Sequence, residues 1–486
     1  MTDLCWMTAR ALRDALAVRQ VSAVEVLTAH LRQIERVNPQ LNAIVTLAAD
    51  AAMRTARELD RQPGPIGPLH GVPVAIKDLV ETAEIRTTYG SRIYGDHVPD
   101  ADALIVRRLR SAGAVVVGKT NTPEFGAGSQ TFNDVFGATR NPWSPDLTAG
   151  GSSGGAAAAL AAGMVPLADG SDLGGSLRNP AAFCGVVGMR PAPGRVPDLD
   201  GGLWDPHSVL GPMARTVDDA ALMLSVIAGP DVRAPLSLEQ SPAPFSNITR
   251  SDLKHVRIAW SRTLGGLPVH PDIAVTLDAA REKLVRLGCD VEEAEPDLSG
   301  ADTVFETLRA LAMLAACGQD AKAHPELVKP EIHDEVRWAG ALRADDLVHA
   351  LQLRDQLYAR VVSFLTRYDV IAAPVTQVLP FDVETRWPSS IGGVAMDRYY
   401  TWMRACSRIS ATTLPALSLP AGLSPGGLPV GLQLIGQPHG ELELLRHAAA
   451  VEEVLSMGSA AGPLPVRYAV NQVPDENRTI KLDDVD

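Results

Sequence analysis

Two glycine-rich segments and one lysine hold the residue types that could do covalent chemistry. Ser152 lies in the segment 150–155 and Ser176 in the segment 171–190, while Lys77 ends a short apolar run. A serine hydroxyl becomes a nucleophile when a nearby base takes its proton. A buried lysine can be that base, because burial disfavours the ammonium form and lowers the pKa toward neutrality. These residues are therefore candidates for a serine hydrolase whose base is a lysine.

The first segment also matches the nucleophile elbow of α/β-hydrolases. Gly150-Gly-Ser152-Ser-Gly154 has the G-x-S-x-G pattern, and a shift by one residue lets Ser153 match as well. An elbow requires an apolar strand directly before it. Residues 142–146 read Pro-Trp-Ser-Pro-Asp and favour turns instead. An α/β-hydrolase is therefore the less favoured alternative.

Residues 113–120 satisfy the P-loop pattern letter for letter, as Gly-Ala-Val-Val-Val-Gly-Lys-Thr. A phosphate-binding loop needs a strand before its glycines and a helix directly after the Lys-Thr pair. Here the four variable residues are themselves apolar enough to form a buried strand, and Pro123 follows shortly after. The segment therefore predicts a strand ending in a polar turn, not an ATPase.

Histidines and cysteines offer no metal site. The eleven histidines form no H-E-x-x-H motif, and the five cysteines lie far apart without C-x-x-C spacing. A zinc hydrolase thus has no ligand set, and neither a metal nor an organic cofactor is expected. His70, beside Gly71, is a possible catalytic group, but a packed loop histidine is the favoured interpretation.

The composition excludes several function classes. The chain has 486 residues, 46% hydrophobic and 21% charged, which is typical of a globular protein with a large core. Its formal charge is −13 and it has no dense Lys/Arg run. A nucleic acid or an anionic membrane is therefore not the expected partner. A small neutral or apolar molecule is the expected partner. Whether the chain forms a homo-oligomer is left open.

No segment has the pattern of a targeting or membrane-spanning sequence. The N-terminus carries charges and lacks a sustained apolar core, unlike a signal peptide. The alanine-rich stretch 156–168 is short and interrupted by Gly163 and Pro166, so it is not expected to span a bilayer. With its cysteines expected to be reduced thiols, the chain is predicted to be cytoplasmic.

An α/β framework must bring the candidate residues together. Ser22 and Glu25 form a capping box, and apolar residues then recur at helical spacing until Asn38-Pro39. Strands and helices alternate afterwards, with strands at 72–76 and 114–117, helices at about 101–112 and 217–228, a strand at 255–260, a helix-rich block at 272–366, a strand at 370–375 and a hairpin-like pair at 416–420 and 429–435. This alternation predicts an α/β fold with a mixed, twisted central sheet covered by helices on both faces.

One large domain over residues 1–462 is expected, because no repeat or strong linker interrupts the chain. Within it, the motifs occupy about 65–200, and residues 126–151 are predicted to be irregular. Residues 463–486 are predicted to be a polar C-terminal tail.

Four stretches carry a resemblance to a known family. They are Gly71-Val-Pro-Val-Ala-Ile-Lys77-Asp78, Gly118-Lys-Thr-Asn-Thr-Pro-Glu-Phe125, Gly150-Gly-Ser-Ser-Gly-Gly155 and Gly170-Ser-Asp-Leu-Gly-Gly-Ser176-Leu-Arg178. They closely resemble the amidase-signature family of serine hydrolases, in which a lysine, a serine and a second serine recur at similar intervals. Weaker similarity extends from residue 8 to about 456. The resemblance implies a single amidase-signature domain and amide hydrolysis through an acyl-enzyme.

The resemblance also implies a role for each site residue. Ser176 would be the nucleophile, and Ser152, following a cis peptide bond, would pass the proton of Ser176 to neutral Lys77. The oxyanion hole would consist of the N–H groups of Leu173, Gly174, Gly175 and Ser176, where glycines leave the backbone accessible. The residues expected to hold this geometry are Ser153, Ser171, Asp172 and Arg178. Gly126, Ala127 and Gly128 are predicted to contact the substrate.

The expected substrate is a small-molecule aryl or alkyl amide, with esters or carbamates as side substrates. Its pocket walls are expected in 126–145 and in about 300–400. The tryptophans considered for an apolar pocket are Trp143, Trp204, Trp338, Trp387 and Trp402, although a tryptophan is more often simply part of the core.

A glutamine-hydrolysing component of an aminoacyl-tRNA amidotransferase is the alternative within the family. It would need a second protein as partner, together with a cation for the glutamine carboxylate, and no cation can be assigned from the sequence. The family often has Asn-Leu-x-Gly before its Pro-Ala-x-Ser-x-Pro strand, whereas residues 410–413 here read Ser-Ala-Thr-Thr. The pocket wall is therefore expected to differ at this point.

Overall fold

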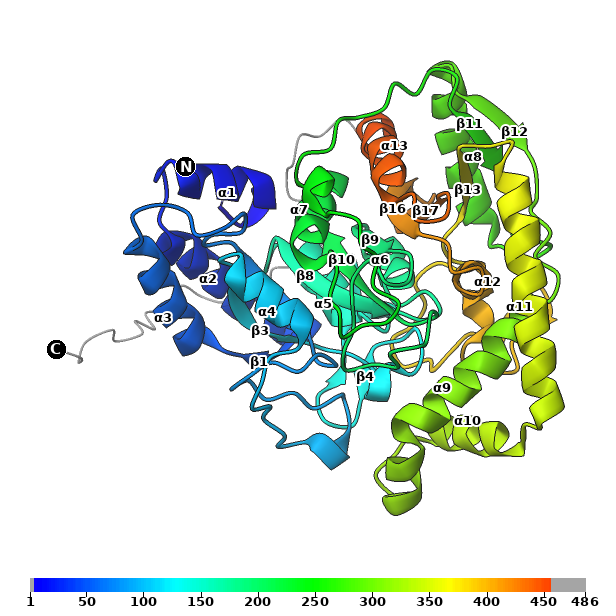
Figure 1. The fold of residues 1–486 in the computed structure, drawn as a ribbon, viewed down its shortest axis with the longest axis horizontal. Helices are drawn as coiled ribbons and strands as arrows, with labels where there is room; N and C mark the ends of the chain where they lie inside the picture. Colours follow the sequence, from blue (N-terminus) through cyan, green and yellow to red (C-terminus); the bar gives the residue numbers. More distant parts are fainter. Residues whose placement is uncertain (1–3, 456–486) are drawn as a thin grey trace.

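An eleven-stranded mixed sheet forms the centre of the structure, a computed structural model that describes residues 4–455 (Figure 1). In spatial order its strands are β1 (Ile44–Leu47), β3 (Val115–Thr120), β2 (Pro73–Lys77), β8 (Leu167–Asp172), β10 (Val209–Ala214), β9 (Val187–Arg190), β16 (Ala416–Leu423), β17 (Pro429–Ile435), β13 (Val370–Pro374), β11 (Arg257–Trp260) and β12 (Asp290–Glu293). The predicted single large α/β domain is confirmed. Its predicted limit at 462 and the tail 463–486 lie outside the described residues.

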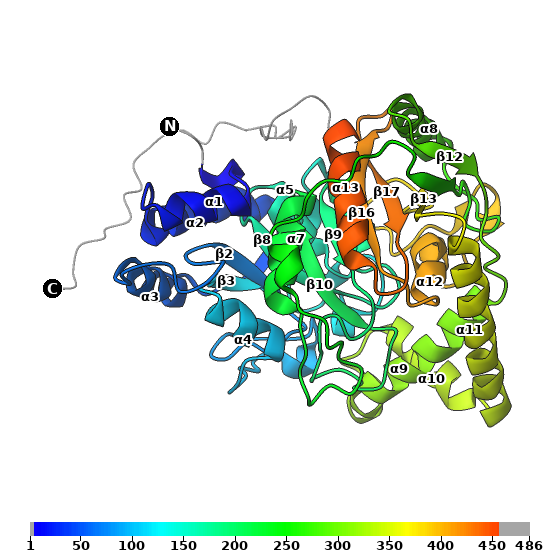
Figure 2. The same cartoon turned by 45° about the horizontal axis from the view of Figure 1, so that its top comes forward.

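Helices cover both faces of this sheet. They are α1 (Ala9–Ala17), α2 (Ala23–Leu41), α3 (Ala49–Asp60), α4 (Leu104–Ser111), α5 (Gly154–Ala161), α6 (Arg178–Cys184), α7 (Val217–Ile227), α8 (Pro271–Arg286), α9 (Ala301–Ala323), α10 (Pro330–Ala341), α11 (Ala344–Leu365), α12 (Arg404–Ser410) and α13 (Glu441–Leu455), with short 3-10 helices at Leu4–Trp6, Arg92–Tyr94, Glu124–Gly126, Ala243–Ser246 and Thr401–Met403. Figure 2 shows α7 and α13 in front of the sheet and α5 behind it. Every residue of α5 is buried, which explains its Gly/Ala composition.

The parallel part of the sheet positions the candidate residues. β2 lies between β3 and β8 and is parallel to both. Carboxyl ends of adjacent parallel strands meet at one edge, where α/β proteins commonly place their sites. Lys77 ends β2 and Asp172 ends β8, so the two motifs that contain them meet at that edge.

The second helix runs further than its sequence pattern predicts. α2 begins at the predicted capping box but includes Pro39 and ends at Leu41, so the predicted stop at Asn38-Pro39 is wrong. The helix ends where Asn42 adopts a left-handed φ of 52°. Asn38 stabilises this end, because its Oδ1 accepts 2.9 Å hydrogen bonds from the backbone N–H groups of residues 43 and 44.

Residues 126–151 are more regular than predicted. They contain two small hairpins, β4 (Phe132–Asn133) with β5 (Gly137–Ala138) and β6 (Arg140–Asn141) with β7 (Ser144–Thr148). Asparagine side chains build the turns: Asn133 Oδ1 accepts from the N–H groups of residues 135 and 136, and Asn141 Oδ1 from that of Trp143. Strand β12, which lies within the predicted helix-rich block 272–366, was also not predicted from the sequence. A further hairpin joins β14 (Ser390–Ile391) to β15 (Val394–Ala395).

Two alternative motifs lack their required context. β7 is the strand nearest to Ser152 in the sequence, but it pairs with β6 and, through Leu147, with Asp382, and it lies outside the central sheet, so residues 150–154 are not a nucleophile elbow. Residues 115–120 are strand β3 itself, and three residues followed by a 3-10 helix come next. The P-loop pattern is therefore coincidental.

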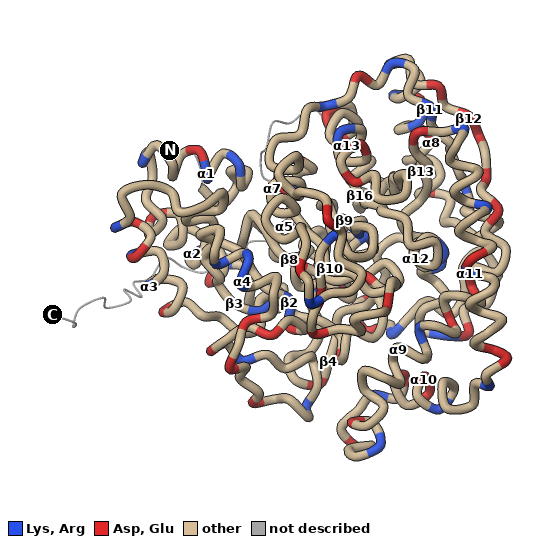
Figure 3. The backbone as a smooth tube through the Cα atoms, in the orientation of Figure 1, with Lys and Arg blue, Asp and Glu red and all other residues tan. Residues whose placement is uncertain are grey.

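Charges of both signs are interspersed around the molecule (Figure 3). Among the helices of residues 4–455, none is long and apolar enough to cross a membrane.

Candidate active site

Lys77 lies fully buried at the end of β2 and contacts two serines. Its Nζ donates to Ser152 Oγ at 2.7 Å and to Ser171 Oγ at 2.9 Å. Burial lowers the pKa of Lys77 to about 7, although the negative charges of Asp169 and Asp172 oppose this shift. Near neutral pH a large fraction of this amine is uncharged, so it can accept a proton from Ser152.

The segment that carries Ser152 is joined to the turn that carries Ser176. The Gly151–Ser152 peptide bond is cis, as predicted. The N–H of Ser153 donates to the carbonyl oxygen of Ser176 at 3.1 Å, and both Ser152 and Ser176 are less than one-tenth exposed. Ser153 thus acts here through its backbone, because its buried Oγ has no hydrogen-bond partner among the described residues.

A buried carboxylate shapes the turn that precedes Ser176. Asp172 Oδ1 accepts from the N–H of Gly175 at 2.8 Å, and Arg178 donates to both carboxylate oxygens of Asp172 at 3.0 Å. Arg190 donates to the main-chain oxygen of Asp172. Burial would raise the pKa of Asp172, but the two arginines outweigh it and hold the pKa well below its usual range. The predicted supporting residues Asp172 and Arg178 therefore form one ionic unit beneath the turn.

Side chains from α9 and the 3-10 helix 401–403 close over the same turn. A Cβ atom on Gly174 would lie 2.6 Å from Phe305 Cζ and 2.8 Å from Met403 Cε, and one on Gly175 would lie 2.5 Å from Cys406 Cβ. No larger residue fits at either position without displacing these side chains. The two glycines thus bring side chains of α9, the 3-10 helix 401–403 and α12 directly against the backbone of the predicted oxyanion hole.

The ionic unit continues into distant parts of the chain. Arg178 also donates to Gln433 Oε1 at 2.6 Å and to Ser410 Oγ at 2.8 Å. Gln433 comes from β17 and Ser410 from α12, and neither was predicted. The unusual sequence at 410–413 was the only signal for Ser410, because contacts between residues more than 200 positions apart emerge only from the fold.

Asp169 and Lys119 are further buried groups that the sequence did not reveal. Asp169 Oδ1 accepts a 2.6 Å hydrogen bond from the main-chain N–H of Lys77, and burial raises the pKa of Asp169 to about 6. Lys119, from the P-loop-like segment, donates to the carbonyl oxygen of Val80 and to Thr82 Oγ1. Burial lowers the pKa of Lys119 to about 8. Lys119 therefore holds the loop that leaves β2.

His70 lies at the other end of the strands from Lys77. A Cβ on Gly113, just before β3, would lie 2.8 Å from His70 Cα, and His70 Nδ1 accepts from the N–H of Ile66. His70 is thus a packed loop residue, as favoured from the sequence. In the part of the chain that the structure describes, no three His, Cys, Asp or Glu side chains are grouped as a metal site requires.

One of the predicted substrate-contacting residues, Gly126, borders Ser152. A Cβ on Gly126 would lie 3.7 Å from Ser152 Oγ. Ala127 and Gly128 line a small hollow, the wall pocket, together with Ser129, Gln130, Phe132, Lys329, Glu331, Arg386, Tyr399 and Trp402. Trp402 is the candidate tryptophan found at this pocket, and it is 1% exposed.

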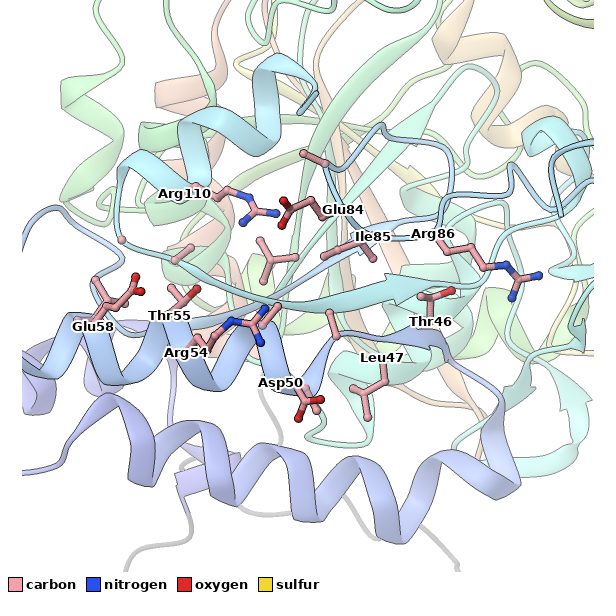
Figure 4. Close-up of a pocket in the computed structure, with 18 of the residues that line it drawn as sticks. Thr46, Leu47, Asp50, Arg54, Thr55, Glu58, Glu84, Ile85, Arg86 and Arg110 are labelled. Atoms are coloured by element: carbon pink, nitrogen blue, oxygen red, sulfur yellow. The ribbon is translucent and has the colours of Figure 1, made fainter. Parts of the chain in front are cut away.

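A larger cavity lies away from the serines. It has a volume of about 710 Å³ and is formed by α3, the end of β1, residues 83–86 and the end of α4 (Figure 4). Its lining includes Arg54, Glu58, Glu84 and Arg110, and Figure 4 shows the last two facing each other. None of the predicted site residues lines this cavity.

Comparisons with known proteins give the family of this chain. The family model described as Amidase matches residues 25–445. An acylamidase of Rhodococcus erythropolis is 35% identical over 465 residues, covering 93% of this chain and 96% of that protein. The structure of a bacterial aryl acylamidase of the amidase-signature family superimposes with a TM-score of 0.87 at 29% identity, covering 92% and 96% of the two chains.

A second kind of relative is equally similar in sequence. A glutamyl-tRNA(Gln) amidotransferase subunit of Moorella thermoacetica is 36% identical over 481 residues, covering 93% of this chain and 97% of that protein. The chain belongs to the amidase-signature family. It is an amide-hydrolysing enzyme that acts on a carbon–nitrogen bond.

Proposed function

We propose that this enzyme hydrolyses small uncharged amides through Ser176, Ser152 and Lys77. The observation that carries the assignment is the 2.7 Å hydrogen bond from the buried Lys77 amine to Ser152 Oγ. A base with a pKa of about 7 is well matched to proton transfer near neutral pH.

In this mechanism Ser176 Oγ attacks the amide carbonyl carbon while its proton passes to Ser152 and the proton of Ser152 passes to Lys77. The carbonyl oxygen becomes an oxyanion, held by N–H groups of residues 173–176. The N–H of Gly175 is shared with Asp172, so the remaining amides carry most of this charge. The proton returns through Ser152 to the leaving amine, and water then hydrolyses the acyl-enzyme.

The arginines near the wall pocket are already paired with carboxylates, which supports an uncharged acyl group. Lys329 Nζ donates to the carbonyl oxygen of Ala127 at 2.5 Å. Arg386 is bound to Glu331 through Nε at 2.7 Å. Binding a carboxylate at Arg386 would require breaking this ion pair, whereas the Lys329 hydrogen bond is to a neutral oxygen.

A third cation close to this wall is paired as well. Arg309 Nη1 donates to Glu335 Oε2 at 2.6 Å, and its guanidinium lies 5.1 Å from the centroid of the Tyr399 ring. Tyr399 in turn lies against Gly128, where a Cβ would be 3.3 Å from its ring. The guanidinium groups of Arg386 and Arg309 are therefore each neutralised by a carboxylate next to this wall.

Glutamine hydrolysis is the second candidate, favoured by the similarity to amidotransferase subunits. Its substrate carries a carboxylate, so the paired cations argue against it. The test is to incubate the purified chain alone with 4-nitroacetanilide and with glutamine, and to measure nitroaniline and ammonia release. We expect the anilide to be cleaved with kcat/KM at least 100-fold above glutamine. Faster hydrolysis of glutamine would overturn the proposal.

A further inference from the structure

The loop between β9 and β10 crosses the strand ends that carry the site. β10 is antiparallel to β8, with Val209 opposite Asp172. Residues before Val209 therefore continue past the end of β8, alongside the turn 173–176. Arg190 fixes this arrangement, because its Nη1 donates both to the carbonyl oxygen of His207, at 2.8 Å, and to that of Asp172.

The other end of the loop rests on the segment that follows Lys77. Leu199 and Asp200 line a hollow of about 490 Å³ together with Glu81, His97 and residues 99–104. That segment leaves β2 directly after Lys77. The loop 199–207 thus extends from the β2 side to the β10 side, and β8, with the serine-bearing turn, lies between them.

Both ends of the loop are held, whereas its tip is apolar and exposed. Asp198 Oδ1 accepts from the N–H groups of residues 200 and 201, at 3.0 and 3.2 Å. Asp205 Oδ1 accepts from the N–H and Nδ1 of His207, at 2.9 and 3.0 Å. Between these anchors, Leu203 is 41% and Trp204 75% exposed. An exposed indole ring is unfavourable in water, so the free energy falls when the ring covers an apolar group.

We propose that Leu203 and Trp204 form a flap that contacts an aromatic leaving group, so that aryl amides are the preferred substrates. The inference rests on the proposed function and adds to it a second wall of the substrate site. A different part of the chain from the wall pocket forms this second wall. The acyl group would lie against residues 126–130, and the amine side of the amide would face the loop. Leu203 and Trp204 are the central residues of a turn closed by a 2.8 Å hydrogen bond from the Asp205 N–H to the Gly202 carbonyl oxygen, so the indole would reach the bound amide by rotation of its own side chain.

The test compares two amides that give the same acetyl-enzyme and differ only in the leaving group. In Trp204→Ala, we expect kcat/KM for 4-nitroacetanilide to fall about tenfold more than kcat/KM for acetamide, and Trp204→Phe to recover most of this loss. Val18→Ala is the matched control, because Val18 is also 75% exposed but follows α1, away from the loop. An unchanged ratio between the two substrates in Trp204→Ala would overturn the inference.

A binding measurement separates this inference from the proposed function. Acetanilide is titrated calorimetrically into Ser176→Ala, with and without Trp204→Ala. We expect the second change to weaken binding about tenfold. Equal affinity in the two variants contradicts the flap, even if catalysis follows the proposed route. Weaker binding in the double variant, together with full activity of Ser176→Ala, would support the flap but contradict the assignment of Ser176 as the nucleophile.

Discussion

The main-chain N–H of Lys77 donates a 2.6 Å hydrogen bond to Asp169 Oδ1, so the base is held by a carboxylate from the neighbouring strand. The second oxygen of Asp169 is buried and has no hydrogen-bond partner among the described residues. The carboxylate therefore fixes the backbone of Lys77, and its charge favours the ammonium form of the Lys77 side chain.

Asp169→Asn should shift the acid limb of the pH profile toward lower pH. The amide oxygen can still accept from Lys77 N–H, but the negative charge that stabilises the ammonium is lost. We expect the apparent pKa of kcat/KM to fall by about one pH unit. The measurement is kcat/KM for 4-nitroacetanilide between pH 5 and pH 9. A shift to higher pH would show that Asp169 does not act on Lys77 through its charge.

Lys77→Ala should abolish most of the activity. In the wild type, activity should rise with pH through one ionisation near 7, because only the neutral amine accepts a proton. Removing the general base should cost about 10²–10⁴-fold in kcat, and the limb near pH 7 should disappear. His70→Ala is the control and should keep near-full kcat. Near-full kcat in Lys77→Ala would mean that another group is the base.

Ser176, rather than Ser152, should become acylated. An active-site serine probe, followed by peptide mass spectrometry, should label the peptide that contains Ser176. The Ser152→Ala variant still contains Ser176, the residue to be labelled. It should react with the probe far more slowly, because the proton path to Lys77 is broken. A label on Ser152 in the wild type would refute the assigned roles.

Asp172→Ala should destabilise the fold strongly, by about 3–5 kcal/mol, because Arg178 and Arg190 would remain buried without their carboxylate. The pKa of Asp172 is lower in the folded than in the unfolded chain, so this contribution is present above pH 4 and is lost as pH falls further. Thermal unfolding of wild type and variant at pH 7 measures the difference. Asp334→Ala, at an exposed pair with Arg337, is the control and should barely change Tm.

Short motifs made much of the site predictable, whereas the residues that long-range packing brings to it could not be predicted. Lys77, Ser152 and Ser176 each lie in a segment whose glycines or apolar run mark it locally. Arg178 was expected to hold the geometry, but its partners Ser410 and Gln433 could not be assigned to it, because both lie on elements more than 200 positions away in the sequence. The contact between Asp169 and Lys77 depends on the register between β8 and β2.

The sheet and its main helices followed from periodicity, whereas elements held by side-chain hydrogen bonds did not. The hairpins in 126–151 have strands of two to five residues, too short for an alternating pattern. They form because asparagine side chains close their turns. The segment after α2 is likewise held by a side chain, because Asn38 Oδ1 accepts from the N–H groups of residues 43 and 44.

The proton relay and the wall pocket come from separate parts of the chain. Lys77 and the serine-bearing turns belong to β2, β8 and the start of α5, whereas most of the wall pocket comes from residues 126–132, 329–331 and 386–402. A mutational library confined to the latter ranges would vary substrate range while leaving the reacting groups in place. The same division gives natural descendants of this enzyme a route to new amides through changes in these wall segments, while selection on the central strands preserves the chemistry.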